Sequence, residues 1–146
     1  MIYSLALFAQ VLVFENELNL ENKDLKKYKN IYLVLLTNDI RKLKLGQKVL
    51  DYKSQIINDQ KKRFEDLQII DEVKFQNLAI EINSFDVVHP CIGENFSFLN
   101  NIRKKRNLEL NFVLSEEDKF SWQFSNKGFF NFKNNIPKIL TNFNLQ

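Results

Sequence analysis

Short apolar segments alternate with longer amphipathic stretches along the chain, and this alternation predicts an α/β fold. The apolar segments cover residues 3–14, 31–36, 67–70, 85–90 and 108–114. The earlier segments are continuous rather than alternating, which is typical of strands that are covered on both faces, whereas the last one alternates. We therefore expect five strands in a sheet that is covered on both faces.

The stretches between these segments carry helical periodicity. Apolar positions recur at helical spacing from Leu43 to Phe64, with polar residues on the other face. Asp71 is placed to cap a second helix, and residues 93–107 predict a third. Strands separated by helices of this length indicate βαβ units, so we predict a three-layer α/β domain with a mostly parallel five-stranded sheet.

The length of 146 residues suits one domain with its own core, so we expect a single α/β domain over 1–146 with a Phe-rich C-terminal segment at 120–146. Within that segment we predict a short helix over 129–135, which Pro137 should end or kink.

The composition indicates in which kind of cellular compartment the protein is found. The single cysteine indicates a reducing compartment, and the apolar opening is too short to span a bilayer and lacks a basic start. We therefore expect a soluble intracellular protein, in the cytoplasm or an organelle matrix, with no membrane span. The abundance of Asn, Lys, Ile and Phe suggests an AT-rich genome.

Several kinds of chemistry are disfavoured. With three glycines the chain has no phosphate-binding Gly-rich loop, so we expect no nucleotide cofactor bound by that route. His89 and Cys91 are too few to form a zinc site or a dependable nucleophile pair. The acids after Ser115 are typical of a helix start. We therefore predict no metal, no cofactor and no catalytic residue, and an enzyme is the less favoured class.

The densest basic cluster is Arg103, Lys104, Lys105 and Arg106, at the end of the third predicted helix. Cations there complement the helix dipole, and they could also contact phosphate groups. Charge is distributed in blocks: residues 41–63 hold eight basic and two acidic residues, whereas 65–94 hold seven acidic and one basic. Such a dipolar surface can orient a partner.

The segment NKGFFNFKNNIPKIL, residues 126–140, has two interpretations. Phe129, Phe132 and Ile136 share one side of a helix, and a stripe of this kind usually packs into a core. Alternatively the segment docks onto a partner or stacks on nucleic acid. In that second interpretation the contact residues, besides the cluster at 103–106, are Lys127, Phe130 and Lys133.

TNDIRKLKLGQKV follows the second predicted strand, and LSEEDKFSW and GFFNFKNNIPKIL follow the last one. These three segments resemble the amino-terminal α/β domain of photolyase-related proteins, in the prokaryotic branch of the photolyase and cryptochrome family that carries an iron–sulfur cluster. TNDIRKLKLGQKV resembles the charged turn and helix start after the second strand. LSEEDKFSW and GFFNFKNNIPKIL resemble the segments that follow the last strand. The likeness extends over most of the chain through the order and spacing of elements.

The resemblance implies an α/β domain that can hold an antenna chromophore in the family, but the residues that help to hold it differ here. The family's Gly-Asp-Gln falls on Phe8, Ala9 and Gln10, and its acidic residue after the second strand falls on Leu36. We also expect that the large helical flavin domain of the family is not part of this chain, and hence that no flavin is bound.

The sequence therefore predicts a stand-alone photolyase-like α/β domain that lacks the flavin-binding catalytic half and acts as an accessory or binding module. A protein partner is expected, and a nucleic acid is possible. The alternative is a basic, Phe-rich structural subunit of a larger protein or ribonucleoprotein assembly, organellar or from a phage. A third hypothesis is a small enzyme with its site near Thr37, Asp39, His89 and Ser115.

Overall fold

A computed structural model describes residues 8–17, 20, 24–90, 93–114, 116–125 and 128–144. The chain divides into two compact units, Leu5–Val113 and a C-terminal unit that begins at Leu114. A single domain over the whole chain stays a prediction.

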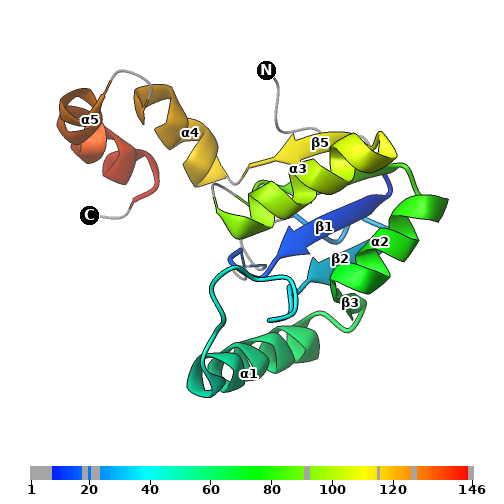
Figure 1. Cartoon of the computed structure of the whole chain (residues 1–146). Coiled ribbons are helices and arrows are strands. Elements are labelled where there is room, and N and C mark those ends of the chain that lie inside the picture. Colours follow the sequence, from blue (N-terminus) through cyan, green and yellow to red (C-terminus); the bar gives the residue numbers. More distant parts are fainter. Residues whose placement is uncertain are drawn as a thin grey trace. The chain divides into compact units, whose positions relative to one another are not determined.

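In the described part of the first unit, five strands form one sheet (Figure 1). The strands are β1 (Gln10–Phe14), β2 (Asn30–Val34), β3 (Leu67–Ile70), β4 (Ser84–Val88) and β5 (Glu109–Val113). Their order is β3-β2-β1-β4-β5, and every neighbouring pair is parallel. The three-layer α/β prediction is therefore confirmed, with a sheet that is parallel throughout.

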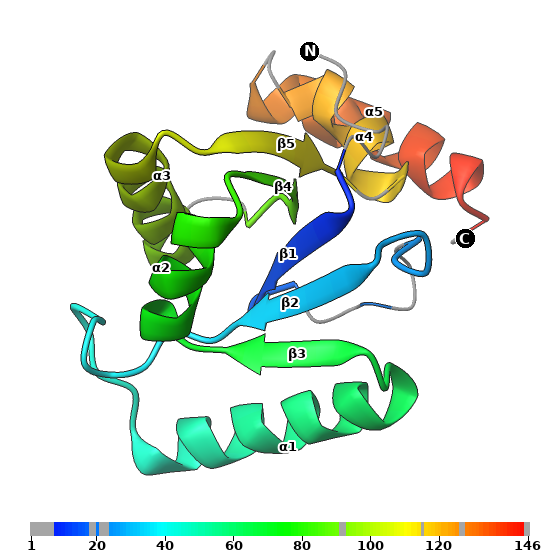
Figure 2. The same cartoon turned by 90° about the vertical axis from the view of Figure 1, so that its right-hand side faces the viewer.

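Three helices connect these strands (Figure 2): α1 (Gln47–Arg63), α2 (Glu72–Glu81) and α3 (Glu94–Arg106). Two hydrophobic clusters, one on each face of the sheet, show how the helices are distributed. Leu12 and Val87 pack with Phe75 of α2 and Leu99 of α3. Strand residues whose side chains point to the other face of the sheet, such as Val13, pack with α1 and with the loop before β2. Because both faces are covered, the strands read as continuous apolar runs.

The starts of β1 and α1 differ from the boundaries that were predicted from the sequence. The first strand begins at Gln10 rather than at residue 3, and residues 1–7 lie outside the described part. The first helix begins at Gln47 rather than near Leu43, because the preceding residues form a loop that Asn38 closes with hydrogen bonds in both directions to Leu45, at 3.0 and 2.9 Å. Asp71 caps α2 as predicted, with its side chain accepting from the Lys74 N–H.

The buried face of α1 also differs from the predicted one. Ile57 and Gln60 are its buried residues, whereas Val49 and Tyr52 are 45% and 64% exposed. The inward positions follow the sequence Leu50, Lys53, Ile57, Gln60 and Phe64, so two polar side chains lie on the packed side. Hydropathy alone could not identify that side.

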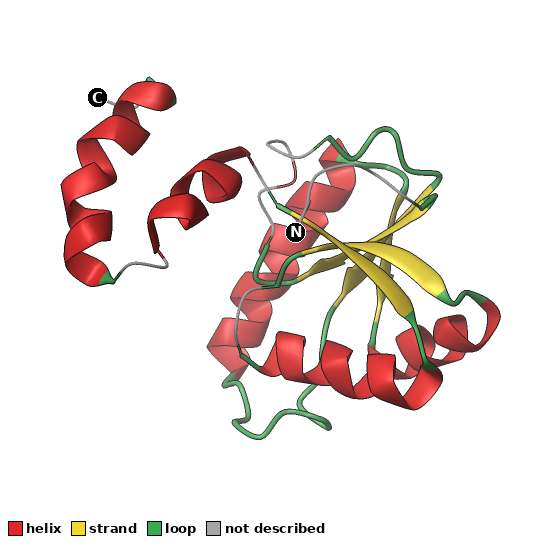
Figure 3. Cartoon of the chain, turned by 90° about the horizontal axis from the view of Figure 1, so that it is seen from above, coloured by secondary structure: helices red, strands yellow, loops and turns green. Residues whose placement is uncertain are grey.

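The C-terminal unit contains two helices, α4 (Glu116–Ser125) and α5 (Phe129–Asn142), shown with the strands and loops in Figure 3. Phe120 of α4 packs edge-on against Phe143, the residue after α5, at a centroid distance of 5.8 Å, and against Phe124 of its own helix at 5.6 Å. Helix α5 continues through Pro137, which the sequence predicted would end or kink it.

No helix in the described part of the chain combines the length and the apolar character that crossing a bilayer requires.

Candidate functional site

The sheet reverses its winding direction between β1 and β4, and this position defines the candidate site. The chain runs outward from β1 through β2 to β3 and then returns to β4 on the other side of β1. In open parallel sheets, ligands bind outside the carboxyl ends of the strands at such a switch point. The loops after β1 and β4 and the start of α3 therefore border the crevice.

Four charged side chains occupy this crevice. Glu15, the first residue after β1, has a side chain that is 2% exposed and accepts a hydrogen bond from Arg41 Nη2. Lys53 Nζ of α1 lies 3.1 Å from the other oxygen of Glu15. Arg41 Nη1 lies 3.4 Å from Oε2 of Glu94, the first residue of α3. We call these four residues the edge cluster.

The edge cluster compensates most of its buried polar atoms, while Glu15 Oε2 is buried without a hydrogen bond among the described residues and has only its ion pair with Lys53. The Arg41 side chain is 7% exposed, and its Nε donates to the Leu36 carbonyl at 3.0 Å. A buried charge is tolerated only when it is paired and hydrogen-bonded, and each donor that is named here has an acceptor. Glu94 also accepts from the Lys42 N–H at 2.9 Å, so the loop after β2 is tied to α3 across the crevice.

Lys53 is the member of the edge cluster with a resolved change in acidity. Burial lowers the pKa of its ammonium group, and the nearby Arg41 guanidinium lowers it further. Both effects disfavour a second cation beside Arg41, and the Glu15 carboxylate is the group that compensates. The cluster is therefore a balanced set in which removal of one member exposes the others to an unfavourable environment.

Amide side chains join the two loops on the other side of the crevice. Asn16 donates to the Pro90 carbonyl at 2.8 Å, and Asn95 donates to the Asn16 side-chain oxygen at 3.1 Å. Helix α3 begins here because Gly93 adopts a φ of 127°, which is a conformation that other residues rarely adopt. The loops after β1 and β4 are thus linked by side chains of this chain.

Thr37 and Glu72 form a second polar contact at the same edge. Both the N–H (3.0 Å) and the hydroxyl of Thr37, just after β2, donate to the Glu72 carboxylate at the start of α2. Burial by itself raises the pKa of Glu72, but the hydrogen bonds from Thr37 outweigh it and hold the pKa below its usual value. This contact fastens the end of β2 to the helix that follows β3.

A pocket of about 330 Å³ lies beside the edge cluster, between the loop after β2 and α3. Leu36, Ile40 and Phe98 supply apolar lining, while Ser97 and Asn101 add polar groups one helical turn apart on α3. The pocket is large enough for a small ligand, and Arg41 forms part of its wall.

The residues of the small-enzyme hypothesis are not assembled into a catalytic arrangement in the described part of the chain. His89 stacks against Phe96 at 5.5 Å and lies 5.0 Å from Phe112, so aromatic packing surrounds it. Thr37 is engaged by Glu72. Cys91 and Ser115 lie outside the described residues.

The described residues contain no group of three or more His, Cys, Asp or Glu side chains that could hold a metal ion.

The predicted contact residues belong to two separate units. Arg103, Lys104, Lys105 and Arg106 form the exposed last turn of α3, which fits their role in complementing the helix dipole. Phe130 and Lys133 are exposed residues of α5, in the C-terminal unit, and Lys127 lies outside the described residues. Whether any of them contacts a partner stays a prediction.

The exposure of α5 corrects the burial that its apolar stripe predicted. None of its residues, all of which are described, is buried. Phe129 is 71% exposed, Phe130 is 78% exposed and Ile136 is 38% exposed. The stripe is real, since Phe129, Phe132 and Ile136 share one side, but a two-helix unit is too thin to enclose it.

Sequence reasoning missed the edge cluster. Glu15 lies just outside the first predicted strand, and Arg41 and Lys53 belong to the basic block at residues 41–63. The available signal was positional, because Glu15 directly follows a buried strand at the carboxyl edge, where functional groups gather in α/β folds.

No protein-family model matches the chain, and no curated protein matches it either.

Proposed function

We propose that this chain is a photolyase-like α/β binding module that works as an accessory subunit and docks onto a protein partner through α4 and α5. The observation that carries the proposal is the exposure of α5, which presents Phe129, Phe130 and Ile136 without burying any residue. Large exposed aromatic patches mark interaction sites, and Phe is enriched in the cores of interfaces.

The character of the edge cluster supports a binding role over a catalytic one. In this chain the crevice at the switch point is occupied by Arg41, held between Glu15 and Glu94. Ion pairs that are satisfied within the protein contribute to structure, whereas a catalytic acid or base needs access to a substrate. The charged side chains at the switch point of the α/β unit thus contribute to its stability rather than to catalysis.

The partner we propose is a protein with an apolar groove. α5 carries two described cations, Lys133 and Lys138, and no acidic residue, while Asn side chains fill most of its polar side. An amphipathic helix of this composition fits the helix-in-groove mode, in which residues at i, i+3 and i+7 act as anchors. Phe129, Phe132 and Ile136 have that spacing.

The test is photo-crosslinking in cells with a photoreactive phenylalanine analogue at position 130. We expect a discrete protein adduct from position 130 and none from the matched position 77, an exposed residue of α2. Phe129→Ser should reduce the adduct at least several-fold, and the control Lys44→Ser should leave it unchanged. Equal labelling from positions 77 and 130, or none from either, would contradict the proposal.

The second candidate is a structural subunit of a larger assembly, and the same exposed aromatic residues favour it. A structural subunit and an accessory module differ in the fraction of copies that are bound to the partner. A structural subunit should be crosslinked in nearly every copy and should aggregate when purified alone, whereas an accessory module should remain monodisperse and partly free.

A further inference from the structure

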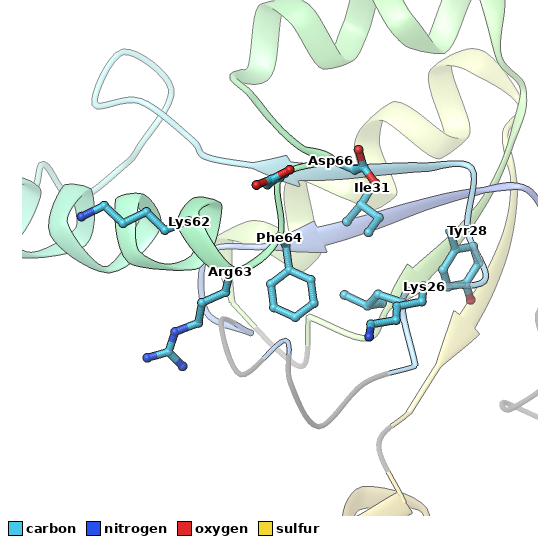
Figure 4. A pocket seen from close by; sticks show the side chains of 9 residues that line it. Lys26, Tyr28, Ile31, Lys62, Arg63, Phe64 and Asp66 are labelled. Carbon is cyan, nitrogen blue, oxygen red and sulfur yellow. The ribbon is translucent and has the colours of Figure 1, made fainter.

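A second cavity lies at the opposite edge of the sheet, where the strands begin, and it belongs to neither the edge cluster nor α5. It has a volume of about 400 Å³, within the range of small-ligand pockets, which is roughly 300–1,000 Å³. Its lining comes from the loop before β2, the start of β2 and the end of α1 (Figure 4).

The wall of this cavity is firmly held. Phe64 follows α1, with its N–H bonded to the Gln60 carbonyl at 2.9 Å and its own carbonyl accepting from Leu67 at 3.0 Å. Tyr28, from the loop before β2, donates its hydroxyl to the buried Asp86 at 2.8 Å. Burial and then this hydrogen bond raise the pKa of Tyr28, so the phenol stays neutral. The cavity therefore has a preformed shape.

Cations reach the cavity from two independent segments. Lys26 belongs to the loop before β2, and Lys62 and Arg63 belong to the last turn of α1. Arg63 is paired with Asp59 at 3.2 Å, whereas neither Lys26 nor Lys62 has an ion-pair partner among the residues that the structure describes. The dipole of α1 explains cations in its last turn, but it does not explain Lys26.

An aromatic ring accompanies these cations. The half-buried Phe64 ring projects from the turn after α1, and Figure 4 shows Lys26 and Arg63 to either side of it. Glu65 and Asp66, from the same turn, add two exposed carboxylates to the lining. Aromatic rings flanked by cations bind nucleotides by stacking on the base and neutralising the phosphate.

We propose that this cavity binds a nucleoside monophosphate, either free or as one unit of a single-stranded nucleic acid. The base stacks on Phe64, and the phosphate is neutralised by the ammonium group of Lys26 beside that ring, while Lys62 adds positive charge at the rim. The Asp66 carboxylate accepts hydrogen bonds from the base, which favours guanine because its N1–H and amino group form an adjacent pair of donors. This proposal is independent of docking through α5.

The test is a titration of the full-length protein with guanosine 5′-monophosphate, uridine 5′-monophosphate and ribose 5-phosphate. We expect the guanine nucleotide to bind more tightly than the uracil nucleotide, and ribose 5-phosphate to bind at least tenfold more weakly. Lys26→Gln/Lys62→Gln should weaken nucleotide binding at least tenfold. The charge-matched control Lys48→Gln/Lys74→Gln, from exposed positions near the other edge, should bind as the wild type does.

Two substitutions of Phe64 distinguish the contribution of ring stacking to binding from the contribution of charge. Phe64→Tyr keeps the aromatic ring and should bind normally, while Phe64→Leu should weaken nucleotides severalfold and leave ribose 5-phosphate unchanged. Circular dichroism checks that both variants are folded. A short single-stranded oligonucleotide distinguishes the two sources: tighter binding that falls steeply with salt identifies a nucleic acid, and affinity equal to the mononucleotide identifies a free nucleotide.

The proposal is overturned if no nucleotide binds, if ribose 5-phosphate binds as tightly as the nucleotides, or if the control pair weakens binding as much as Lys26→Gln/Lys62→Gln does. Binding of an acidic peptide in preference to every nucleotide would overturn it as well.

Discussion

Arg41 connects three elements of the α/β unit through one guanidinium group. It contacts Glu15 after β1, the Leu36 carbonyl after β2 and Glu94 at the start of α3. Because Glu15 and Arg41 are both almost fully buried, the loss of one leaves the other with an uncompensated charge.

Replacement of Arg41 therefore tests the edge cluster. Arg41→Leu should reduce the free energy of unfolding by about 3–5 kcal/mol, as expected when one partner of a buried ion pair is removed. The double variant Arg41→Leu/Glu15→Leu should recover a substantial part of that loss, because the two almost fully buried charges are then both removed. Urea denaturation of the single and double variants measures this coupling, with the exposed Lys42→Leu as control. Additive effects of the two substitutions would contradict the arrangement.

The contact of Thr37 with Glu72 makes stability depend on pH. The pKa of Glu72 is lower in the folded protein than its ordinary value of 4.5, so its contribution to stability is complete above that value. The contribution is lost as the pH falls through the lower, folded-state pKa.

Thr37→Val should remove the hydroxyl donor, raise the pKa of Glu72 and cost roughly 1–3 kcal/mol near neutral pH. The difference in stability between wild type and variant should shrink as the pH falls below the folded-state pKa, because the protonated carboxyl gains little from that donor. Urea denaturation across this pH range measures the difference, and NMR titration of the Glu72 carboxyl carbon measures the pKa. An unchanged pKa in Thr37→Val would exclude the hydroxyl as a cause of the shift.

At the scale of elements, the strands were the most predictable part of the fold. Residues 67–70 were identified with the boundaries that the structure has, because Leu67 to Ile70 is a compact apolar run bounded by acidic residues. The inward side of α1 was not predictable, since Lys53 and Gln60 lie on it for reasons that involve distant partners. Local patterns define elements, whereas polar packing between elements depends on tertiary contacts.

Val34 tests the central strands. Its side chain is fully buried in β2 against the face that α2 and α3 cover. Val34→Asp should place a charge without a partner in that core and cost several kcal/mol, which is enough to abolish cooperative folding in a domain of marginal stability. Thermal unfolding monitored by circular dichroism measures the effect. A soluble Val34→Asp protein with an unchanged melting temperature would show that β2 is wrongly placed.

Pro137 limits the stability of α5. Inside a helix, proline removes a backbone donor and costs about 3 kcal/mol relative to alanine. Pro137→Ala should therefore slow amide exchange in α5 without changing exchange in β1, while the control Asn134→Ala should have a much smaller effect. Hydrogen exchange resolved by peptide measures both. Equal exchange in α5 of the wild type and Pro137→Ala would mean that the helix already continues through this position without cost.

At the scale of the whole molecule, the two units differ in what holds them together. The sheet of the α/β unit has a hydrophobic cluster on each face and an edge cluster at its switch point. In the C-terminal unit, neither α5 nor the described side chains of α4 include a buried residue. Helices of this length are marginal in water without a packed surface, so we expect α4 and α5 to be less stable than the α/β unit in the isolated protein.

The α/β architecture could be predicted because periodicity and length report on it directly. The exposure of α5 could not, since an apolar stripe is equally consistent with a core and with an interface. Phe129 and Phe132 have the same spacing whether the stripe packs into a core or forms an interface. The two cases differ in whether other elements cover the stripe.

Hydrogen exchange of the full-length protein tests the central claim most directly, because it compares both units in one sample. We predict strong protection in β1, β2 and β4, with opening free energies near that of global unfolding, and weak protection in α4 and α5. Addition of the partner that position 130 captures should protect α5 selectively. Protection of α5 equal to that of β1 in the isolated protein would contradict the account, because α5 would then need no partner.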